Sequence, residues 1–387
     1  MRLNRNNMMP SSTLPSYINN NDSLLDIIRL IRSENVGAVT FHKLITKYGS
    51  AAKALDAIPH LTTRAGSRRS ISVYPADKAQ MEIEKTQQSG ASFISYNHAQ
   101  YPELLKHVPD APPLLIAHGK TELLTHKNII AIVGSRNASA NGRKYAQKLA
   151  NELGEAGFYV VSGLARGIDR YAHQGALEHG TIGVIAGGIN HIYPPENKDM
   201  FAIMKERGVV MTEAPFGAAP QHRHFPARNR IIAGMSQGTV IVEAAKKSGS
   251  LITAKYALDY NREVCAVPGS PMDPRSEGGN HLIQQGATLV SHVDDIIHAC
   301  RDAQMQIPPT SEQYLFDTQA EIDENNLDSE RQAVAVLIDA TPVTIEDIII
   351  MSGVDARIVN VILLEMELAG MLRRHQGGTI SRNFEEE

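Results

Sequence analysis

Short apolar runs alternate with amphipathic stretches through the middle of this chain. Six runs rich in β-branched residues are predicted to be β-strands, at 128–133, 159–163, 181–188, 209–212, 239–244 and 263–269. Helix-like segments separate them, at 141–156, 169–179, 196–207, 226–236 and 250–260. Because uninterrupted apolar strands that alternate with helices are typical of parallel sheets covered on both faces, this region predicts an α/β fold with a Rossmann-like parallel sheet.

The segment before this region has a helical pattern. Residues 22–60 predict three short helices, with Gly37 separating the first from the other two. Residues 61–75 contain three arginines and few large apolar groups, which indicates a loop. Two apolar runs, at 93–96 and 113–118, are candidate strands that precede the parallel sheet.

The end of the chain predicts a winged helix. Three helical segments, at 329–340, 344–353 and 355–370, are followed by a hairpin around Gly377-Gly378, which is the winged-helix order. The patterns together predict five segments. They are a disordered polar leader at 1–21, a small helical domain at 22–90, an extended Rossmann-like domain at 91–300, an acidic linker at 301–330 and a winged-helix-like domain at 331–384.

Composition narrows the class of protein. Of the 387 residues, 42% are apolar and 21% are charged, which is enough for packed cores in two or three domains. The only two cysteines, Cys265 and Cys300, exclude a disulfide framework. No apolar run approaches the ~20 residues of a membrane span, and the N-terminus lacks a signal-peptide core. We therefore expect a soluble, cytoplasmic protein with no membrane partner.

The net charge of −4 does not describe the folded parts. Residues 301–330 carry one Arg against eight Asp and Glu residues, and three further acids end the chain. Because the acidity is concentrated in these segments, local basic patches are more informative than the total.

The loop after the first strand of the sheet could hold an anion. Ligands of open parallel sheets bind beyond the carboxyl ends of the strands, and here the loop reads Gly134-Ser135-Arg136. Gly134 allows close approach of the backbone, the helix starting near Asn141 attracts a phosphate, and Arg136 supplies a planar cation. The alternative is a tight turn with a solvated arginine.

The loop after the second strand repeats this composition. It contains a hydroxyl, two glycines and an arginine, namely Ser162, Gly163, Gly167 and Arg166. Asp169 is expected to cap the following helix, and His173, one turn later, is expected to be structural. The third strand ends in another glycine turn at 186–188.

The stretch at 222–234 is the most unusual in the chain. Three arginines, Arg223, Arg228 and Arg230, lie within eight residues and surround Phe225. Such a cluster suits single-stranded nucleic acid, because arginines bind phosphates and the ring stacks on a base. The alternative is a solvated helix start with the ring in the core and an arginine paired with Glu243 or Asp169.

A fourth loop follows the strand at 239–244. Its hydroxyls and N–H groups could make a further anion cradle, contributed by Ser248, Gly249, Ser250 and Thr253. We expect the four loops to converge on one edge of the sheet.

The motifs for dinucleotide binding, ATP binding and metal binding are missing from the sequence. No G-x-G-x-x-G follows the first strand, and the segment ending in Gly119-Lys120-Thr121 has Leu114 where a P-loop needs glycine. His222 and His224 have no ligand set to complete a metal site, and Glu243 is the only suspected catalytic carboxylate. We therefore expect no cofactor, no metal and no catalytic residues.

Taken together, the loop motifs of the sheet region resemble those of the bacterial DNA-processing protein A family (DprA, also called Smf). The resemblance rests on GSR at 134–136, SGLARGID at 162–169, YPPEN at 193–197, FPARNRIIAG at 225–234, EAAKKSGSLITA at 243–254 and VPGSP at 267–271. It covers about residues 95–300. The helical N-terminal unit is similar to the family's sterile-alpha-motif-like module, and the C-terminal unit to its winged-helix module.

The resemblance implies a non-enzymatic recombination mediator. Family members bind single-stranded DNA, dimerise through the Rossmann-like domain and load the RecA recombinase during natural transformation (competence). It implies a DNA pocket made by Arg136 and by Phe225, Arg228, Asn229 and Arg230, lined by the SGLARGID and SGSLITA loops.

Two other functions stay open. One is a nucleotide-phosphate hydrolase of the lysine-decarboxylase-like Rossmann type, although its PGG motif is missing and Glu243 is displaced by one position. The other is a duplex-DNA regulator that uses the winged helix. Beyond Asp355 at its start, the helix at 355–370 carries one base, Arg357, and two acids, Glu365 and Glu367. Arg373 and Arg374 on the wing are therefore the better candidate contacts.

Overall fold

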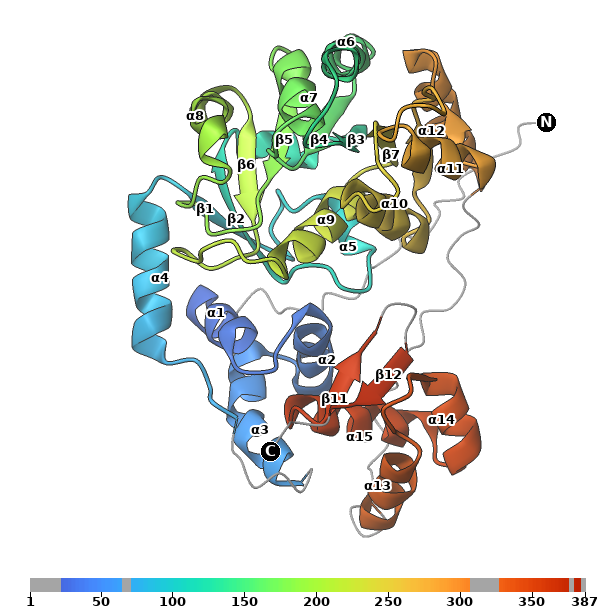
Figure 1. The fold of residues 1–387 in the computed structure, drawn as a ribbon. Coiled ribbons are helices and arrows are strands. Elements are labelled where there is room, and N and C mark those ends of the chain that lie inside the picture. The colour runs from blue at the N-terminus through green and yellow to red at the C-terminus, as the bar shows by residue number, and fades with distance from the viewer. Residues whose placement is uncertain (1–21, 65–70, 307–326, 376–378, 384–387) are drawn as a thin grey trace, which may run out of the picture.

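The computed structural model describes residues 22–64, 71–306, 327–375 and 379–383. Figure 1 shows a sheet domain with an N-terminal helical unit and a C-terminal winged-helix unit side by side below it. The expected leader at 1–21 and the wing turn at 377–378 lie outside the described residues. None of the helices in the described ranges has the length and apolar character needed to cross a bilayer.

The sheet has nine strands in the order β1-β2-β6-β5-β4-β3-β7-β8-β9. They are β1 Ser92–Ser95, β2 Leu114–Gly119, β3 Ile129–Gly134, β4 Tyr159–Ser162, β5 Thr181–Val184, β6 Val209–Thr212, β7 Gly238–Val242, β8 Glu263–Ala266 and β9 Thr288–Leu289. The pairs β1–β2 and β2–β6 are antiparallel and all others are parallel. This confirms the predicted α/β class. The chain runs from β3 outward to β6 on one side and from β7 outward to β9 on the other, so the strand order reverses between β3 and β7, and the loop after β3 opens at that point.

Helices cover both faces of the sheet. They are α5 Glu103–Lys106, α6 Ala140–Glu155, α7 Ile168–Ala176, α8 Lys198–Arg207, α9 His224–Gly234, α10 Ser250–Asp259, α11 Glu277–Gln284 and α12 Val293–Gln306. Alternate residues of β3 serve the two sides: Ile130 and Ile132 belong to the core with α6 and α7, and Ala131 and Val133 to the core with α9 and α10. The central strand is therefore buried on both faces.

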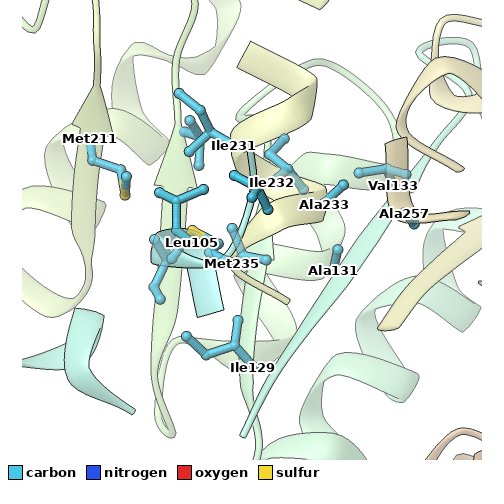
Figure 2. Close-up of a cluster of buried hydrophobic side chains, with 14 of the residues drawn as sticks. Leu105, Ile129, Ala131, Val133, Met211, Ile231, Ile232, Ala233, Met235 and Ala257 are labelled. Carbon is cyan, nitrogen blue, oxygen red and sulfur yellow. The ribbon is translucent and has the colours of Figure 1, made fainter. Parts of the chain in front are cut away.

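The second half of α9 anchors that helix to the sheet. Figure 2 shows Ile231, Ile232 and Ala233 of α9 within the apolar cluster that also holds Leu105 and Met211. All five side chains are at most 1% exposed. Packing at this end fixes the position of the rest of α9, which carries Phe225, Arg228 and Arg230.

Four helices form the N-terminal unit, α1 Leu24–Arg32, α2 Ala38–Tyr48, α3 Ala51–Arg64 and α4 Ala76–Gln88. The hydroxyl of Ser23 accepts the N–H of Asp26 and caps α1, and α2 ends at Gly49 in the left-handed conformation. The loop predicted at 61–75 is wrong for its first four residues. Leu61 is 2% exposed in the core, and this packing keeps the chain helical beyond Pro59.

The C-terminal unit has the predicted winged-helix order. It contains α13 Leu327–Val336, α14 Ile345–Ser352 and α15 Ala356–Leu368, with β10 Val343–Thr344, β11 Leu372–Arg374 and β12 Thr379–Arg382 in a three-stranded sheet. The linker expected at 301–330 is helical at both ends, because α12 continues to its Gln306 and α13 begins at Leu327.

His173 lies inside the sheet domain, as a structural residue would. It is fully buried on α7, and its Nδ1 is 2.7 Å from the hydroxyl oxygen of Thr181 at the start of β5. Burial, aided by the positive charge of Arg228, lowers the pKa of His173 to about 3. The folded protein therefore holds this ring in its neutral form.

Stability should fall as the solution is acidified below the ordinary histidine pKa of 6.5. Between that value and about 3 the unfolded chain binds a proton at His173 that the folded chain does not bind. This difference removes about 2 kcal/mol between pH 7 and pH 5. Urea unfolding of wild type and His173→Gln across this range measures the effect. The variant should lose less stability on acidification, and equal slopes would contradict the assignment.

Candidate nucleic-acid interface

A pocket opens at the carboxyl edge of the sheet, where the loops after β3, β4 and β5 meet the start of α9. Its lining residues are Arg136, Gly163, Ala165, Arg166, Ile185, Ala186, Gly187, His191, Tyr193, Pro194, Pro220, Phe225 and Arg228. These residues are far apart in the sequence, so only the folded sheet brings them together.

The loop after β3 is held tightly against β7. Ser135 donates its N–H to the carbonyl of Glu243 at 2.7 Å. A Cβ on Gly134 would lie 1.9 Å from the carbonyl oxygen of Val242, so glycine is required there. The backbone at 134–135 is thus a support that presents Arg136 to solvent at the pocket.

The start of α6 already holds an anion of the protein itself. Glu243 accepts the N–H of Ser139, the N-cap residue, at 2.9 Å through Oε2, and its Oε1 bonds to the Ser139 hydroxyl. The expectation that this helix start binds a phosphate is therefore wrong, because a carboxylate occupies the place. The same contacts give Glu243 a structural role.

Asp169 organises the loop after β4. It was expected to cap α7, but it lies in the first turn of that helix, and the N-cap is Gly167 at φ 74°. Its Oδ2 accepts the N–H groups of Gly163 and Ala165 at 3.1 and 3.3 Å. Burial raises the pKa of this carboxyl, with Arg228 opposing the shift.

Arg228 forms the floor of the pocket. It is 6% exposed, and its Nη1 donates to the carbonyl of Val184 at 3.0 Å. Burial lowers its pKa to about 10, with the charge of Asp169 opposing the shift, so it stays positive at neutral pH. A Cβ on Gly163 would lie 1.5 Å from Nη1, so the guanidinium fits only under a glycine.

The mouth of the pocket combines cations with aromatic rings. The Arg136 guanidinium lies 5.1 Å from the centroid of the Phe225 ring, and Tyr193 meets Phe225 edge to face at 5.8 Å. The Tyr193 side chain is 48% exposed. Arg166 contacts Glu196 at 3.4 Å with both side chains 59% exposed, a weak and screened pair.

Five of the predicted site residues line the pocket. They are Arg136, Gly163, Arg166, Phe225 and Arg228. The alternative that Phe225 is buried in the core is wrong, because its side chain is half-buried and lines the pocket. Gly134, Ser135 and Gly167 support the loops from behind: Ile168, which follows Gly167, donates its N–H to the carbonyl of Ser135 at 3.2 Å.

Other predicted residues lie elsewhere. Arg230 bonds to the carbonyl of Asp110 and pairs with Glu213, on the side of α9 away from the pocket. We therefore correct its expected role from DNA contact to structural anchor. The Ser162 hydroxyl is buried and donates to Ile132 at 2.6 Å.

The fourth loop does not line the pocket. Ser250 and Thr253 are 8% and 1% exposed, and Ser248 bonds to Ser250. The Asn229 amide donates to the carbonyl of Gly249 at 3.2 Å, which ties this loop to α9. Three loops and a helix start converge, where four loops were expected.

The two wing arginines belong to a different unit. Arg373 is exposed on β11, whereas Arg374 donates from Nε to Glu367 at 2.9 Å. Both lie in the winged-helix sheet and neither contributes to the pocket.

Sequence reasoning missed Tyr193, His191 and Pro220. Tyr193 begins the YPPEN segment, which contributed only to the family resemblance. Its exposed ring is identified as part of the pocket only when the fold places the turn after β5 against α9.

Three family models match consecutive parts of the chain. The model described as DNA recombination-mediator protein A matches residues 92–301. A DprA-like N-terminal HHH domain matches 21–84, in place of the expected sterile-alpha-motif-like module, and a DprA winged helix domain matches 318–378.

Individual relatives give the same picture. The chain is 43% identical over 221 residues to the DNA processing protein DprA of Bacillus subtilis, covering 57% of this chain and 74% of that protein. It is 33% identical over 310 residues to protein Smf of Escherichia coli, covering 79% and 82%.

Two solved structures are similar. One is DNA processing protein A of Streptococcus pneumoniae, with a TM-score of 0.58, 34% identity, and coverage of 71% of this chain and 97% of that chain. The other is DNA processing protein A of Helicobacter pylori, described for its single-stranded DNA binding mode. It has a TM-score of 0.50, 29% identity, and coverage of 55% and 96%.

Gly163→Ala should disrupt the pocket floor. The new methyl group overlaps the Arg228 guanidinium, so the variant should lose about 1–3 kcal/mol of stability through overpacking. Gly249→Ala is the matched control, because no atom lies within 4 Å of its added Cβ. Thermal unfolding of both variants measures the difference. A Gly163→Ala protein as stable as Gly249→Ala would contradict the close approach.

Proposed function

Because this chain belongs to the DprA/Smf family of DNA recombination-mediator proteins, we propose that it binds single-stranded DNA in the pocket at the carboxyl edge of its sheet. The observation that carries the proposal is the combination of the Arg136 guanidinium over the Phe225 ring at the mouth with the buried Arg228 at the floor. Phosphates would contact the arginines, and an unpaired base would stack on the exposed ring of Tyr193 beside the half-buried ring of Phe225.

The charge of the pocket supports this ligand. Its lining includes three arginines and no Asp or Glu among the described residues. Contacts to phosphates carry little sequence information, so the protein would accept strands of many sequences. Tyr193 and Phe225 offer stacking surfaces that suit any base.

The nearby carboxylates favour binding over catalysis. Asp169 accepts two backbone N–H groups, and Glu243 is bonded to Ser139. Neither lines the pocket, so neither is placed to activate water against a bound nucleotide. This arrangement weighs against the hydrolase alternative, and we propose a non-catalytic mediator.

Loss of the cation and the ring should weaken binding of a single strand. Stacking contributes ~1–3 kcal/mol per base, so Arg136→Ala combined with Phe225→Ala should raise the Kd for an oligothymidine at least about tenfold. Fluorescence anisotropy at two salt concentrations measures the affinity and the number of phosphate contacts. Arg207→Ala removes a charge outside the pocket and is the control. Unchanged affinity in a folded double variant, or salt-independent binding by wild type, would contradict the proposal.

We also propose that the protein acts as a homodimer that loads RecA onto single strands in natural transformation. Family membership supports this proposal. Two pockets on one strand would raise the effective affinity without any new contact, because the second binding event becomes intramolecular.

RecA loading should depend on the pocket. Wild-type protein should accelerate RecA filament growth on single-stranded DNA, and the Arg136→Ala/Phe225→Ala variant should not, because it cannot hold the strand. Filament growth on a fluorescent strand measures RecA loading, and light scattering of the free protein measures its oligomeric state. A monomeric protein, or a double variant that accelerates growth as wild type does, would contradict the model.

A further inference from the structure

Helix α15 has two apolar faces that serve different cores. One face belongs to the winged-helix core and repeats at helical spacing, with Val359, Ile362, Leu363 and Met366. The other face consists of Leu364 and Leu368, one turn apart. These two leucines are 3% and 0% exposed, and they lie in the core cluster of the N-terminal helices α1–α3. Figure 1 shows α15 beside α3 and α2.

A polar contact fixes the C-terminal end of α15 on the same surface. The Asn35 side-chain amide donates to the carbonyl of Leu368 at 3.0 Å, which satisfies one of the carbonyls that the helix end leaves open. Asn35 is at φ 60°, a conformation that asparagine tolerates. Gly370, at φ 72°, lies under this amide, and a Cβ there would be 3.2 Å from its nitrogen.

The charges of α15 do not suit a phosphate backbone. Its single arginine, Arg357, pairs with Asp355 at 3.0 Å. Its two acids are also paired, Glu365 with Arg331 at 3.0 Å and Glu367 with Arg374 at 2.9 Å. A helix that reads DNA presents cations and polar donors to the groove, whereas this helix presents leucines and a paired acid to its neighbour.

A lysine of the N-terminal unit is enclosed at this contact. Lys43 of α2 lies near Arg374 and Glu367, and its Nζ is buried without a hydrogen-bond partner among the described residues. Burial and the charge of Arg374 lower the pKa of Lys43 to about 8. The basic groups at this junction are thus enclosed between the two units.

We propose that α15 is a protein-docking helix that binds the N-terminal helical unit of the same chain. In a winged-helix DNA reader the third helix enters the major groove. Here the face with Leu364 and Leu368 is occupied by protein, so the winged helix holds the N-terminal unit in place. This inference is independent of the pocket and of its ligand.

Distance measurements on the full chain test the docking. Spin labels at Lys53→Cys on α3 and Glu346→Cys on α14 report the separation of the two units. The two native cysteines are buried, so the label should attach only at the two new positions. Wild type should give one narrow distance distribution. Leu364→Ser with Leu368→Ser should broaden and lengthen it, and should leave the winged-helix core residues unchanged.

A matched control uses the same unit. Ile350→Ser with Met351→Ser removes two apolar side chains of α14 that are 78% and 66% exposed, and it should keep the wild-type distribution. If the α15 variant does not fold, Asn35→Asp changes only the N-terminal side. Its carboxylate would face the Leu368 carbonyl and should lower the docked population severalfold.

Three results would overturn the proposal. The first is a narrow wild-type distribution in folded Leu364→Ser/Leu368→Ser and in Asn35→Asp. The second is a loss of affinity for a 30-base-pair duplex of tenfold or more in the folded leucine variant, where we expect less than twofold. The third is a short distance that appears only when singly labelled chains are mixed, which would make a second copy the partner.

Discussion

A buried cation, the guanidinium of Arg228, organises the edge of the sheet where the pocket forms. Placing a charge where it is 6% exposed is unfavourable unless nearby groups compensate. The carbonyl of Val184 and the charge of Asp169 provide that compensation, and Asp169 in turn holds the N–H groups of the loop after β4. Gly163 leaves the space that the guanidinium occupies. The loops after β4 and β5 and the start of α9 therefore depend on one another.

The same helix is fastened from its other side by Arg230. That residue pairs with Glu213 and bonds to Asp110, and the hydroxyl of Tyr260 donates to Asp110 as well. Arg32 of the N-terminal unit donates to the carbonyl of Glu213 at 3.2 Å. Thus α9 is fixed between the pocket and the helical unit, and a shift of either arginine would move the ring of Phe225.

The sequence predicted the sheet well because strand and helix patterns are local. It could not predict which basic residues face the pocket. Arg228 and Arg230 are two positions apart on α9, so they point about 200° away from each other, and only the position of the helix on the sheet decides which one lies inside. The contact of Glu243 with Ser139 joins residues 104 positions apart, which no local pattern reveals. Tyr193 was missed because its role in the pocket depends on the ring of Phe225, which is distant in the sequence and adjacent only in the fold.

Helix α15 of the winged helix has more apolar positions than its own core uses, which indicates a second protein contact. A small core needs one apolar stripe on each helix, and α15 carries a second stripe in Leu364 and Leu368. That excess is visible in the sequence, but the partner is not, since the matching surface is formed by helices more than 300 positions earlier. Apolar surface gains free energy from burial against any complementary face, whereas a DNA groove rewards charge and hydrogen bonding. The composition of this helix therefore favours contact with protein, and the hydrogen bond from the Asn35 amide to the Leu368 carbonyl directs that contact to the N-terminal unit.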